Sequence, residues 1–399
     1  MLFSKEVGWK ISGINREYHR SFCKNYCRKS KRLTVFLCIA ALGLFTGCEK
    51  GFVTKEETSD QIVTAETKEK TDTNTKTDRK EASADIFAMD TYMTVAAYGE
   101  HGQEAVDAAE KEIERLDDLL STGNGKSEVS QINRNGGGVL SPDTLALLKR
   151  SLEIYKSTDG AYDITIYPLM KLWGFTTKQF VVPDEDALAD ALELVGSDAL
   201  SWSEGGKKQK LVLEKEGAAI DFGGIAKGYA SDRIMEIYKE YGVSSGLVSL
   251  GGNISALGVK PDGTKWRIAI QDPEDENGYL AVLNIENEAV ITSGGYERYF
   301  EEDGIIYHHI IDPSTGYPAN NGLISVTIVS EDGTLADALS TSLYVMGTEK
   351  AMAYCKDHAV ADGFDVILYT DDGKLYATSG ITPNITSDME ILEIRTSGD

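Results

Sequence analysis

Cysteine and histidine are scarce in this chain of 399 residues, which has five of each. The cysteines are Cys23, Cys27, Cys38, Cys48 and Cys355. If residues 1–47 are removed as an N-terminal leader, only Cys48 and Cys355 remain. With Cys48 lipidated, no intramolecular disulfide can form, even in an oxidising compartment. Cys355 lies in an apolar helical pattern, which predicts a small buried side chain. A zinc site made of clustered cysteine and histidine has no support.

Positive charge is also in short supply. The chain has 40 Lys and Arg against 64 Asp and Glu, a net charge of −24. Residues 1–47 hold nine of the basic and two of the acidic residues, so their removal leaves 31 against 62 and a net charge of −31. A surface of this charge repels nucleic acid and anionic lipid, which excludes nucleic-acid binding.

The N-terminus has the pattern of a secretory signal. The basic stretch KNYCRKSKR (24–32) precedes LTVFLCIAALGLFTGC (33–48), an apolar run short for a membrane span. Its end resembles the lipobox of bacterial lipoproteins, in which the cysteine is lipidated and becomes the new N-terminus. We therefore expect a signal peptide over 1–47, lipidation of Cys48, and anchoring to the outer face of a bacterial plasma membrane. An uncleaved single-span anchor is the alternative.

The next segment is almost free of large apolar residues. Residues 49–84 are rich in Thr, Lys, Glu and Asp and cannot bury enough apolar surface to offset the entropy of folding. We expect a lipidated cysteine and flexible tether over 48–84, a folded domain over 85–385, and a C-terminal tail over 386–399.

The folded part mixes helical and strand patterns without a regular βαβ alternation or an internal repeat. This favours one α+β domain. Residues 86–99 alternate like one strand, and 122–138 read as a Gly/Asn loop. Helices are predicted over 103–121, 141–160, 184–196, 225–242, 335–347 and 349–360. Further strands are predicted over 246–252, 266–272, 280–286, 289–295, 305–311, 324–330, 364–370 and 375–380.

Neither a Walker loop nor a G-x-G-x-x-G dinucleotide fingerprint is present. The turn DFGGIAKGYASDRI (221–234) still places glycines just before a helix, where backbone amides can approach a phosphate. Lys227 adds a cation, and Asp221 can accept a hydrogen bond from a ligand hydroxyl or amine. A strand-to-helix turn with a capping acid explains the same spacing.

Two further clusters carry candidate chemistry. In YHHIIDPSTGYP (307–318), His308 and His309 point to opposite faces of a strand, so one imidazole can face a pocket as a general base. A structural histidine is the alternative. Asp337 and Thr341 lie four residues apart on one helical face and offer the hard oxygens that Mg²⁺ prefers. An exposed first-turn acid is the alternative there. Together with the glycine turn, these residues describe a site for a Mg²⁺-bound pyrophosphate.

Several motifs, in the same order along the chain, resemble the ApbE family, the FAD:protein FMN transferases. They are SEVSQIN, GAYDITIYPLMKLWGF, DFGGIAKGYASD, LVSLGGNISALG, ITSGGYERYF, HHIIDPSTGYP and ADALSTSLYVMG, and they span nearly all of 85–380. The resemblance implies a single T-fold-related catalytic domain of mixed helices and largely antiparallel sheet. It also implies that the enzyme cleaves FAD with Mg²⁺, attaches FMN to a threonine of a partner protein, and releases AMP.

The resemblance also assigns roles to residues. His309 matches the histidine that helps to deprotonate the acceptor, and the Mg²⁺ ligands are Gly224 (main-chain oxygen), Asp337 and Thr341. The residues that match FAD contacts are Met89, Ala161, Tyr162, Asp163, Asp221, Lys227 and Ile311. Two departures stand out: Asp90 replaces a glycine that is common in the family, and STGNG before SEVSQIN lacks an aromatic that some members carry. Trp173 is expected in the core.

The acceptor implied is an extracytoplasmic flavoprotein of a membrane redox system. A Mg²⁺-dependent FAD pyrophosphatase would use the same residues, with water replacing threonine. A lipoprotein that binds FAD without chemistry would not need Asp337, Thr341 and His309 together. A solute-binding lipoprotein would show two similar lobes, which the pattern lacks.

Overall fold

The computed structural model describes residues 80–203 and 209–398. The predicted signal peptide, Cys48 and nearly all of the tether lie outside the described residues. The chain divides into a larger unit, Thr58–Arg298 with His308–Asp399, and a smaller one whose described part is Tyr299–Tyr307. The strand β11 (Tyr299–Glu302) pairs with β12 (Ile305–His308), whose last residue belongs to the larger unit. The Phe300 and Tyr307 rings stack.

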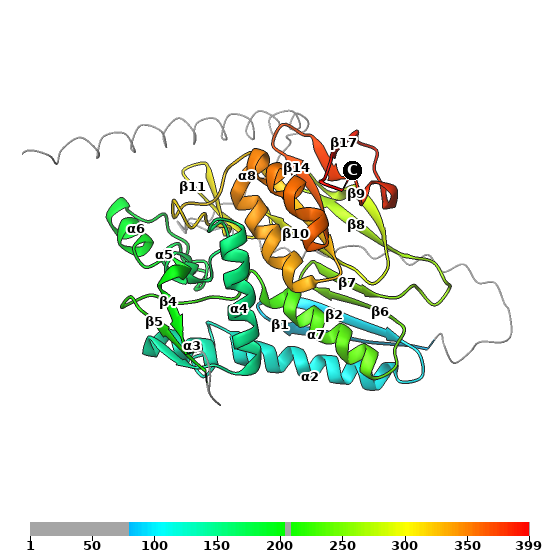
Figure 1. The fold of residues 1–399 in the computed structure, drawn as a ribbon, viewed down its shortest axis with the longest axis horizontal. Helices are drawn as coiled ribbons and strands as arrows, with labels where there is room; N and C mark the ends of the chain where they lie inside the picture. Colours follow the sequence, from blue (N-terminus) through cyan, green and yellow to red (C-terminus); the bar gives the residue numbers. More distant parts are fainter. Residues whose placement is uncertain (1–79, 204–208, 399) are drawn as a thin grey trace, which may run out of the picture. The chain divides into compact units, whose positions relative to one another are not determined.

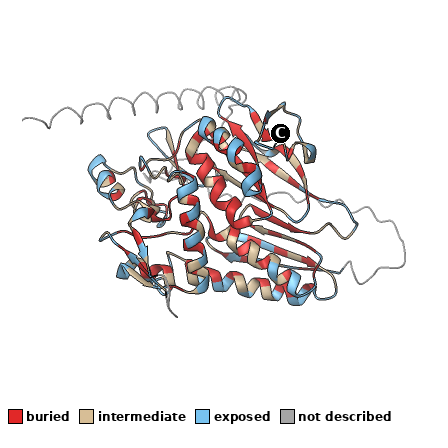
Figure 2. Cartoon of the chain, viewed as in Figure 1, coloured by how far each residue is buried: buried red, intermediate tan, exposed pale blue. Residues whose placement is uncertain are grey.

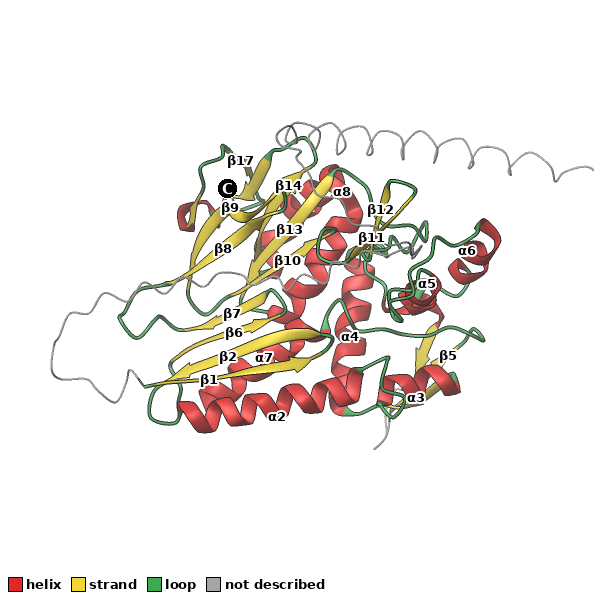
Figure 3. Ribbon diagram, turned by 180° about the vertical axis from the view of Figure 1, so that it is seen from behind, coloured by secondary structure: helices red, strands yellow, loops and turns green. Residues whose placement is uncertain are grey.

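A nine-stranded sheet forms the centre of the larger unit (Figures 1 and 3). All neighbouring strands in it are antiparallel except β15 and β17. This confirms the prediction of an α+β fold with a largely antiparallel sheet. In spatial order the strands are β1 (Glu81–Ala88), β2 (Thr91–Tyr98), β6 (Ser245–Leu250), β7 (Asn253–Leu257), β10 (Ala289–Gly294), β13 (Leu323–Ser330), β14 (Phe364–Thr370), β15 (Leu375–Thr378) and β17 (Ile391–Ile394).

Helices cover one face of this sheet, with their buried sides turned toward it (Figure 2). In α4, Ser141 caps the first turn by accepting from the Thr144 amide, and Pro142 supplies a preset φ. In the described chain the helices are α2 (Gly102–Leu120), α3 (Glu128–Asn135), α4 (Pro142–Ser157), α5 (Tyr167–Leu172), α6 (Glu185–Leu192), α7 (Ala226–Glu240) and α8 (Gly333–Asp362). None of these helices has the length and apolarity that crossing a membrane requires.

Two small sheets complete the larger unit. The strands β8 (Trp266–Asp272), β9 (Asp275–Ile285) and β16 (Ile385–Thr386) form one, which packs in a second core on the other face of the central strands. The other contains β3 (Gly137–Val139), β5 (Lys210–Leu213) and β4 (Leu200–Trp202). The strands β7, β10, β13 and β14 are therefore covered on both faces, which explains why most of their residues are buried.

The single strand predicted over 86–99 is wrong, because the chain folds there into the β1–β2 hairpin. Met89 and Asp90 form its turn with φ of 49° and 60°. Two successive positive φ values match the twist of a tight hairpin and favour glycine or aspartate at these positions. This explains why aspartate can replace glycine at position 90.

The loop predicted over 122–138 is also wrong, since α3 and β3 lie within it. The missed signal is Ser127, whose side chain accepts from the Ser130 amide, with Gly136 in the left-handed conformation at the other end. The fold also begins at Glu81 rather than 85. It continues beyond 385, because Ile391–Ile394 adds to the sheet beside β15.

The two helices predicted over 335–360 follow each other in α8 with a break at Gly347. This glycine has φ of 75° and ψ of 175°. An added Cβ would lie 2.3 Å from Cβ of Asn321, so both the backbone conformation and the close packing require glycine. Cys355, in the second half of α8, is fully buried as predicted.

Candidate active site

The N-terminus of α7 and the first turns of α8 lie side by side at close range (Figure 1). A Cβ added to Gly228 would lie 2.2 Å from the Gly333 oxygen and 2.7 Å from Cβ of Asp337. Only glycine allows this approach. As a result the Gly228 amide donates to Oδ2 of Asp337 at 2.9 Å, in the turn of α7 where the helix dipole favours negative charge.

Asp337 is a buried carboxylate held by neutral donors. Its side chain is 4 % exposed, and its Oδ1 accepts from Nδ2 of Asn253 at 2.9 Å. No lysine or arginine of the described chain forms an ion pair with it. A buried charge without a counter-charge is costly, so this site is chemically suited to a divalent cation. The alternative of an exposed first-turn acid is wrong.

Thr341 and Gly224 lie beside each other at this position. An added Cβ on Gly224 would lie 3.7 Å from Oγ1 of Thr341 and 3.3 Å from Cε2 of Tyr162. Oγ1 of Thr341 also lies 3.3 Å from Oγ of Ser293, at the end of β10. The structure thus brings Gly224 to Thr341, one helical turn from Asp337. Within the described residues there is no group of three or more His, Cys, Asp or Glu that could hold a metal ion by itself. The set therefore fits an ion whose remaining ligands are water and phosphate, as Mg²⁺ commonly has.

The chain before α7 is fixed by Asn133 of α3. Its side-chain amide donates to the Ile220 oxygen and accepts from the Ile220 amide, both at 2.8 Å. The next amide, that of Asp221, donates to the Ile164 oxygen. This explains the final asparagine of SEVSQIN, for which the sequence analysis gave no role.

Asp221 then folds back over the glycine turn. Its Oδ1 accepts from the Gly223 amide at 2.7 Å. Burial raises the pKa of Asp221, while the Gly223 hydrogen bond and the Arg298 charge lower it and Asp90 raises it. The hairpin turn at Asp90 and the segment containing Arg298 are therefore close enough to influence this carboxyl group.

His309 has one ring nitrogen engaged. Both its amide, at 3.0 Å, and its Nδ1, at 3.2 Å, contact the main-chain oxygen of Arg298. Because a carbonyl only accepts, Nδ1 carries the hydrogen and Nε2 has a free lone pair. Burial keeps the pKa of His309 well below its ordinary value, and the electrostatic effects of Arg298, His308 and Lys227 lower it further. The hydrogen bond to the Arg298 main chain raises this pKa but does not outweigh them. The imidazole is thus neutral and able to accept a proton.

His308 faces the other way, as predicted. Its Nε2 donates to the Ala319 oxygen at 2.8 Å, and its Nδ1 accepts from the Ile310 amide at 3.3 Å. Burial lowers the pKa of His308 to about 4. Of the two histidines, His308 is therefore the structural one.

Glu297 follows β10 in the motif ITSGGYERYF and was not among the predicted site residues. Its side chain is accessible to solvent, yet the protein around it raises its pKa to about 7. The charges of Lys227 and Arg298 lower the pKa of this carboxyl group, and Asp337 raises it. Lys227 and Asp337 are therefore close enough to influence Glu297, and Lys227 and Arg298 also influence His309. A carboxylate next to arginine at a strand end was the available signal.

The other predicted FAD contacts are mostly interior. The Asp163 carboxylate accepts from Thr165 and from Ser197, so both of its oxygens are engaged within the protein. Tyr162 is 5 % exposed beneath Gly224, and Ile311 is buried. Ala161 and Met89 are partly buried against the core. The side chains of Asp163, Tyr162 and Ile311 are therefore buried, and Tyr162 packs beneath Gly224.

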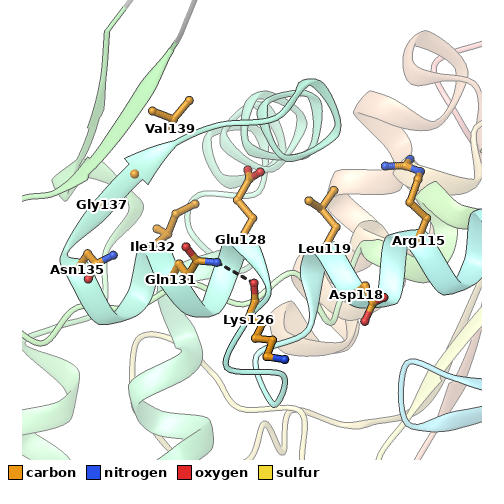
Figure 4. A pocket seen from close by; sticks show the side chains of 11 residues that line it. Arg115, Asp118, Leu119, Lys126, Glu128, Gln131, Ile132, Asn135, Gly137 and Val139 are labelled. Carbon is orange, nitrogen blue, oxygen red and sulfur yellow. Dashed lines mark hydrogen bonds between the residues drawn. The ribbon is translucent and has the colours of Figure 1, made fainter.

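Trp173 is in the core, as predicted. It is fully buried, and its indole N–H donates to the Gly316 oxygen at 2.8 Å. A surface groove of about 620 Å³ lies elsewhere, between the end of α2, α3 and β3 (Figure 4). None of the predicted site residues lines it, so the groove and the candidate chemistry are separate features.

Comparison with known proteins places these features in a family. The ApbE family model matches residues 89–364. The FAD:protein FMN transferase of Vibrio cholerae is 36% identical over 278 residues, which cover 68% of this chain and 81% of that protein. The solved ApbE protein of Thermotoga maritima has a TM-score of 0.69 and 33% identity, and it matches over 74% of this chain and 96% of its own. The solved flavin transferase ApbE of Vibrio cholerae has a TM-score of 0.68 and 30% identity, and it matches over 76% and 99%.

The neutral state of His308 predicts a pH dependence of stability. Its pKa is lowered on folding, so the unfolded chain binds the proton more readily, and the stabilisation present above pH 6.5 is lost as pH falls toward 4. Between pH 7 and pH 5 this amounts to about 2 kcal/mol. His308→Gln has no group that titrates here, so it does not lose this unfolding free energy as pH falls from 7 to 5. The difference in unfolding free energy between the parent protein and His308→Gln should therefore become smaller at pH 5. Urea denaturation of both proteins at the two pH values measures this, and a constant deficit would contradict the assignment.

Proposed function

The chain belongs to the ApbE family, and we propose that it is a Mg²⁺-dependent transferase that moves FMN from FAD to a threonine of a partner protein. The observation that carries the proposal is Asp337, a buried carboxylate without a counter-ion in the described chain, one helical turn from Thr341 and Gly224. The identity to FAD:protein FMN transferases supports FAD as substrate and a protein as acceptor.

The residues around Asp337 have separate roles in this proposal. The Asp337 and Thr341 oxygens and the Gly224 carbonyl would hold Mg²⁺, which supplies a Lewis acid that neutralises charge on the pyrophosphate. Lys227 binds phosphate oxygens at the N-terminus of α7, where amides also face the anion. Asp221 accepts from a donor group of the flavin nucleotide.

The neutral imidazole of His309 takes the proton in the transfer step. The acceptor threonine oxygen attacks the FMN phosphorus, and its hydrogen goes to Nε2 of His309. The bond between that phosphorus and the bridging oxygen breaks, so AMP leaves with the bonding electron pair and FMN is joined to threonine by a phosphoester. Positioning and charge stabilisation supply most of the rate in such transfers.

Intact-mass spectrometry of an acceptor domain with an exposed threonine tests this function directly. Residues 80–399, FAD, Mg²⁺ and the acceptor are incubated, and AMP is followed in parallel. We expect the acceptor to gain one FMN for each AMP released, and the reaction to stop on adding EDTA. AMP without a mass gain on the acceptor would instead support the FAD pyrophosphatase alternative. Bound FAD without either product would contradict enzymatic function and leave a flavin-binding lipoprotein.

Two variants on α8 test the metal assignment in the same assay. Asp337→Asn preserves side-chain shape but removes the charge, so AMP formation should fall by roughly 100-fold or more, because a metal contributes several kcal/mol. Asp357→Asn changes an exposed carboxylate on the same helix and is the matched control, with no expected effect. Equal activity in the two variants would refute the metal assignment.

We further propose that the protein is attached to the outer face of the plasma membrane through lipid on Cys48. The support is the basic and apolar leader that ends at Cys48, followed by a polar tether. An exposed extracytoplasmic flavoprotein of a membrane redox system is then the fitting acceptor. Labelled palmitate should enter the full chain and not Cys48→Ala in growing cells. Labelling of both would contradict Cys48 as the lipid site.

A further inference from the structure

Arg298 occupies a special position relative to His309. Its main-chain oxygen accepts from the His309 amide at 3.0 Å and contacts Nδ1 of the same residue at 3.2 Å. The backbone of Arg298 thus sets which imidazole nitrogen is free. Because these contacts use the main chain, they remain when the side chain is substituted.

The Arg298 guanidinium has no hydrogen bond or ion pair to any described residue. The arginines of the helical face differ: Arg115 pairs with Glu112 and Asp143, and Arg150 with Asp332. The Arg298 charge nevertheless acts on Asp221 before α7, on Glu297 after β10, and on His309 after β12. The main-chain contacts hold Arg298 beside His309, and its exposed side chain carries a charge that no described residue pairs.

A guanidinium presents five N–H donors in a planar fork that matches two phosphate oxygens at once. Its charge does not titrate in the working range, unlike that of a buried lysine. Lys227 acts on Glu297 and on His309 as well, so two cations lie close to the same two groups. Such a pair fits a diphosphate, whose two phosphoryl groups both carry negative charge.

We propose that Arg298 is a further catalytic residue whose guanidinium binds the pyrophosphate oxygens of FAD and the phosphate of departing AMP, while its carbonyl orients His309. This inference rests on the proposed function. In the transfer step no proton moves to or from Arg298. It donates hydrogen bonds to the oxygens on which charge collects as the bond to AMP breaks.

Three variants separate this role from a structural one. Arg298→Gln removes the charge and the fork, Arg298→Lys keeps only the charge, and Arg267→Gln changes an exposed arginine of β8 as the control. Binding of FAD and of riboflavin, which lacks the pyrophosphate, is measured by flavin fluorescence. AMP formation is measured with the acceptor and Mg²⁺ present.

We expect Arg298→Gln to weaken FAD binding by about tenfold and to leave riboflavin binding unchanged, because each bidentate charged contact is strong. AMP formation should fall by roughly 100-fold or more, as when a single preorganised donor is removed from a reacting anion. Arg298→Lys should lie between Arg298→Gln and the parent protein. Arg267→Gln should match the parent, and the melting temperatures should agree because Arg298 is exposed.

The charge of Arg298 also faces His309, together with Lys227 from α7 and His308 from β12. Loss of the guanidinium should therefore move the acidic limb of the kcat/KM profile to higher pH in Arg298→Gln, a change that a merely structural residue would not cause. Equal losses of FAD and riboflavin binding, or parent-like AMP formation, would overturn the proposal. If the parent protein forms no AMP, the proposed function fails, and the FAD-to-riboflavin comparison still decides whether Arg298 binds the pyrophosphate.

Discussion

The crossing of α7 and α8 is the contact on which the site depends. Gly228 permits it, and its amide binds the Asp337 carboxylate. The support is reciprocal, because Asp232 of α7 accepts from the Gly333 and Thr334 amides at the start of α8. Burial raises the pKa of Asp232 to about 6, while these hydrogen bonds oppose the rise. Each helix thus caps the other, and Asp337 is held rigidly at the helix junction.

Charge is distributed unevenly around that junction. The buried Asp337 carboxylate is bound by neutral donors. Lys227 and Arg298, by contrast, form no ion pair in the described chain. The same cations help to hold His309 neutral, so one arrangement serves both anion binding and proton acceptance. Such a site is preorganised for a polyanionic ligand, because the ligand's negative charges can pair with Lys227 and Arg298.

The sequence allowed most helices and strands to be located, because α4 and α6 begin at capping side chains and α7 has apolar residues at helical spacing. The β1–β2 turn escaped prediction, since Met89 and Asp90 look like ordinary strand residues until their positive φ is seen. Helical spacing paired Asp337 with Thr341, but Gly224 lies more than a hundred residues before them, and its assignment as a ligand came only from the family resemblance. Glu297, Arg298 and Asn133 gained roles only from the fold, because main-chain contacts and electrostatic neighbours leave no spacing pattern.

The most direct measurement of the central claim is anomalous diffraction from crystals of residues 80–399 soaked with Mn²⁺ as a substitute for Mg²⁺. We predict an anomalous peak within coordination distance of an Asp337 oxygen and near Oγ1 of Thr341 and the Gly224 carbonyl. The same soak of Asp337→Asn should show no peak there. A peak bound elsewhere in the parent protein, with Asp337 still bonded only to Gly228 and Asn253, would contradict it.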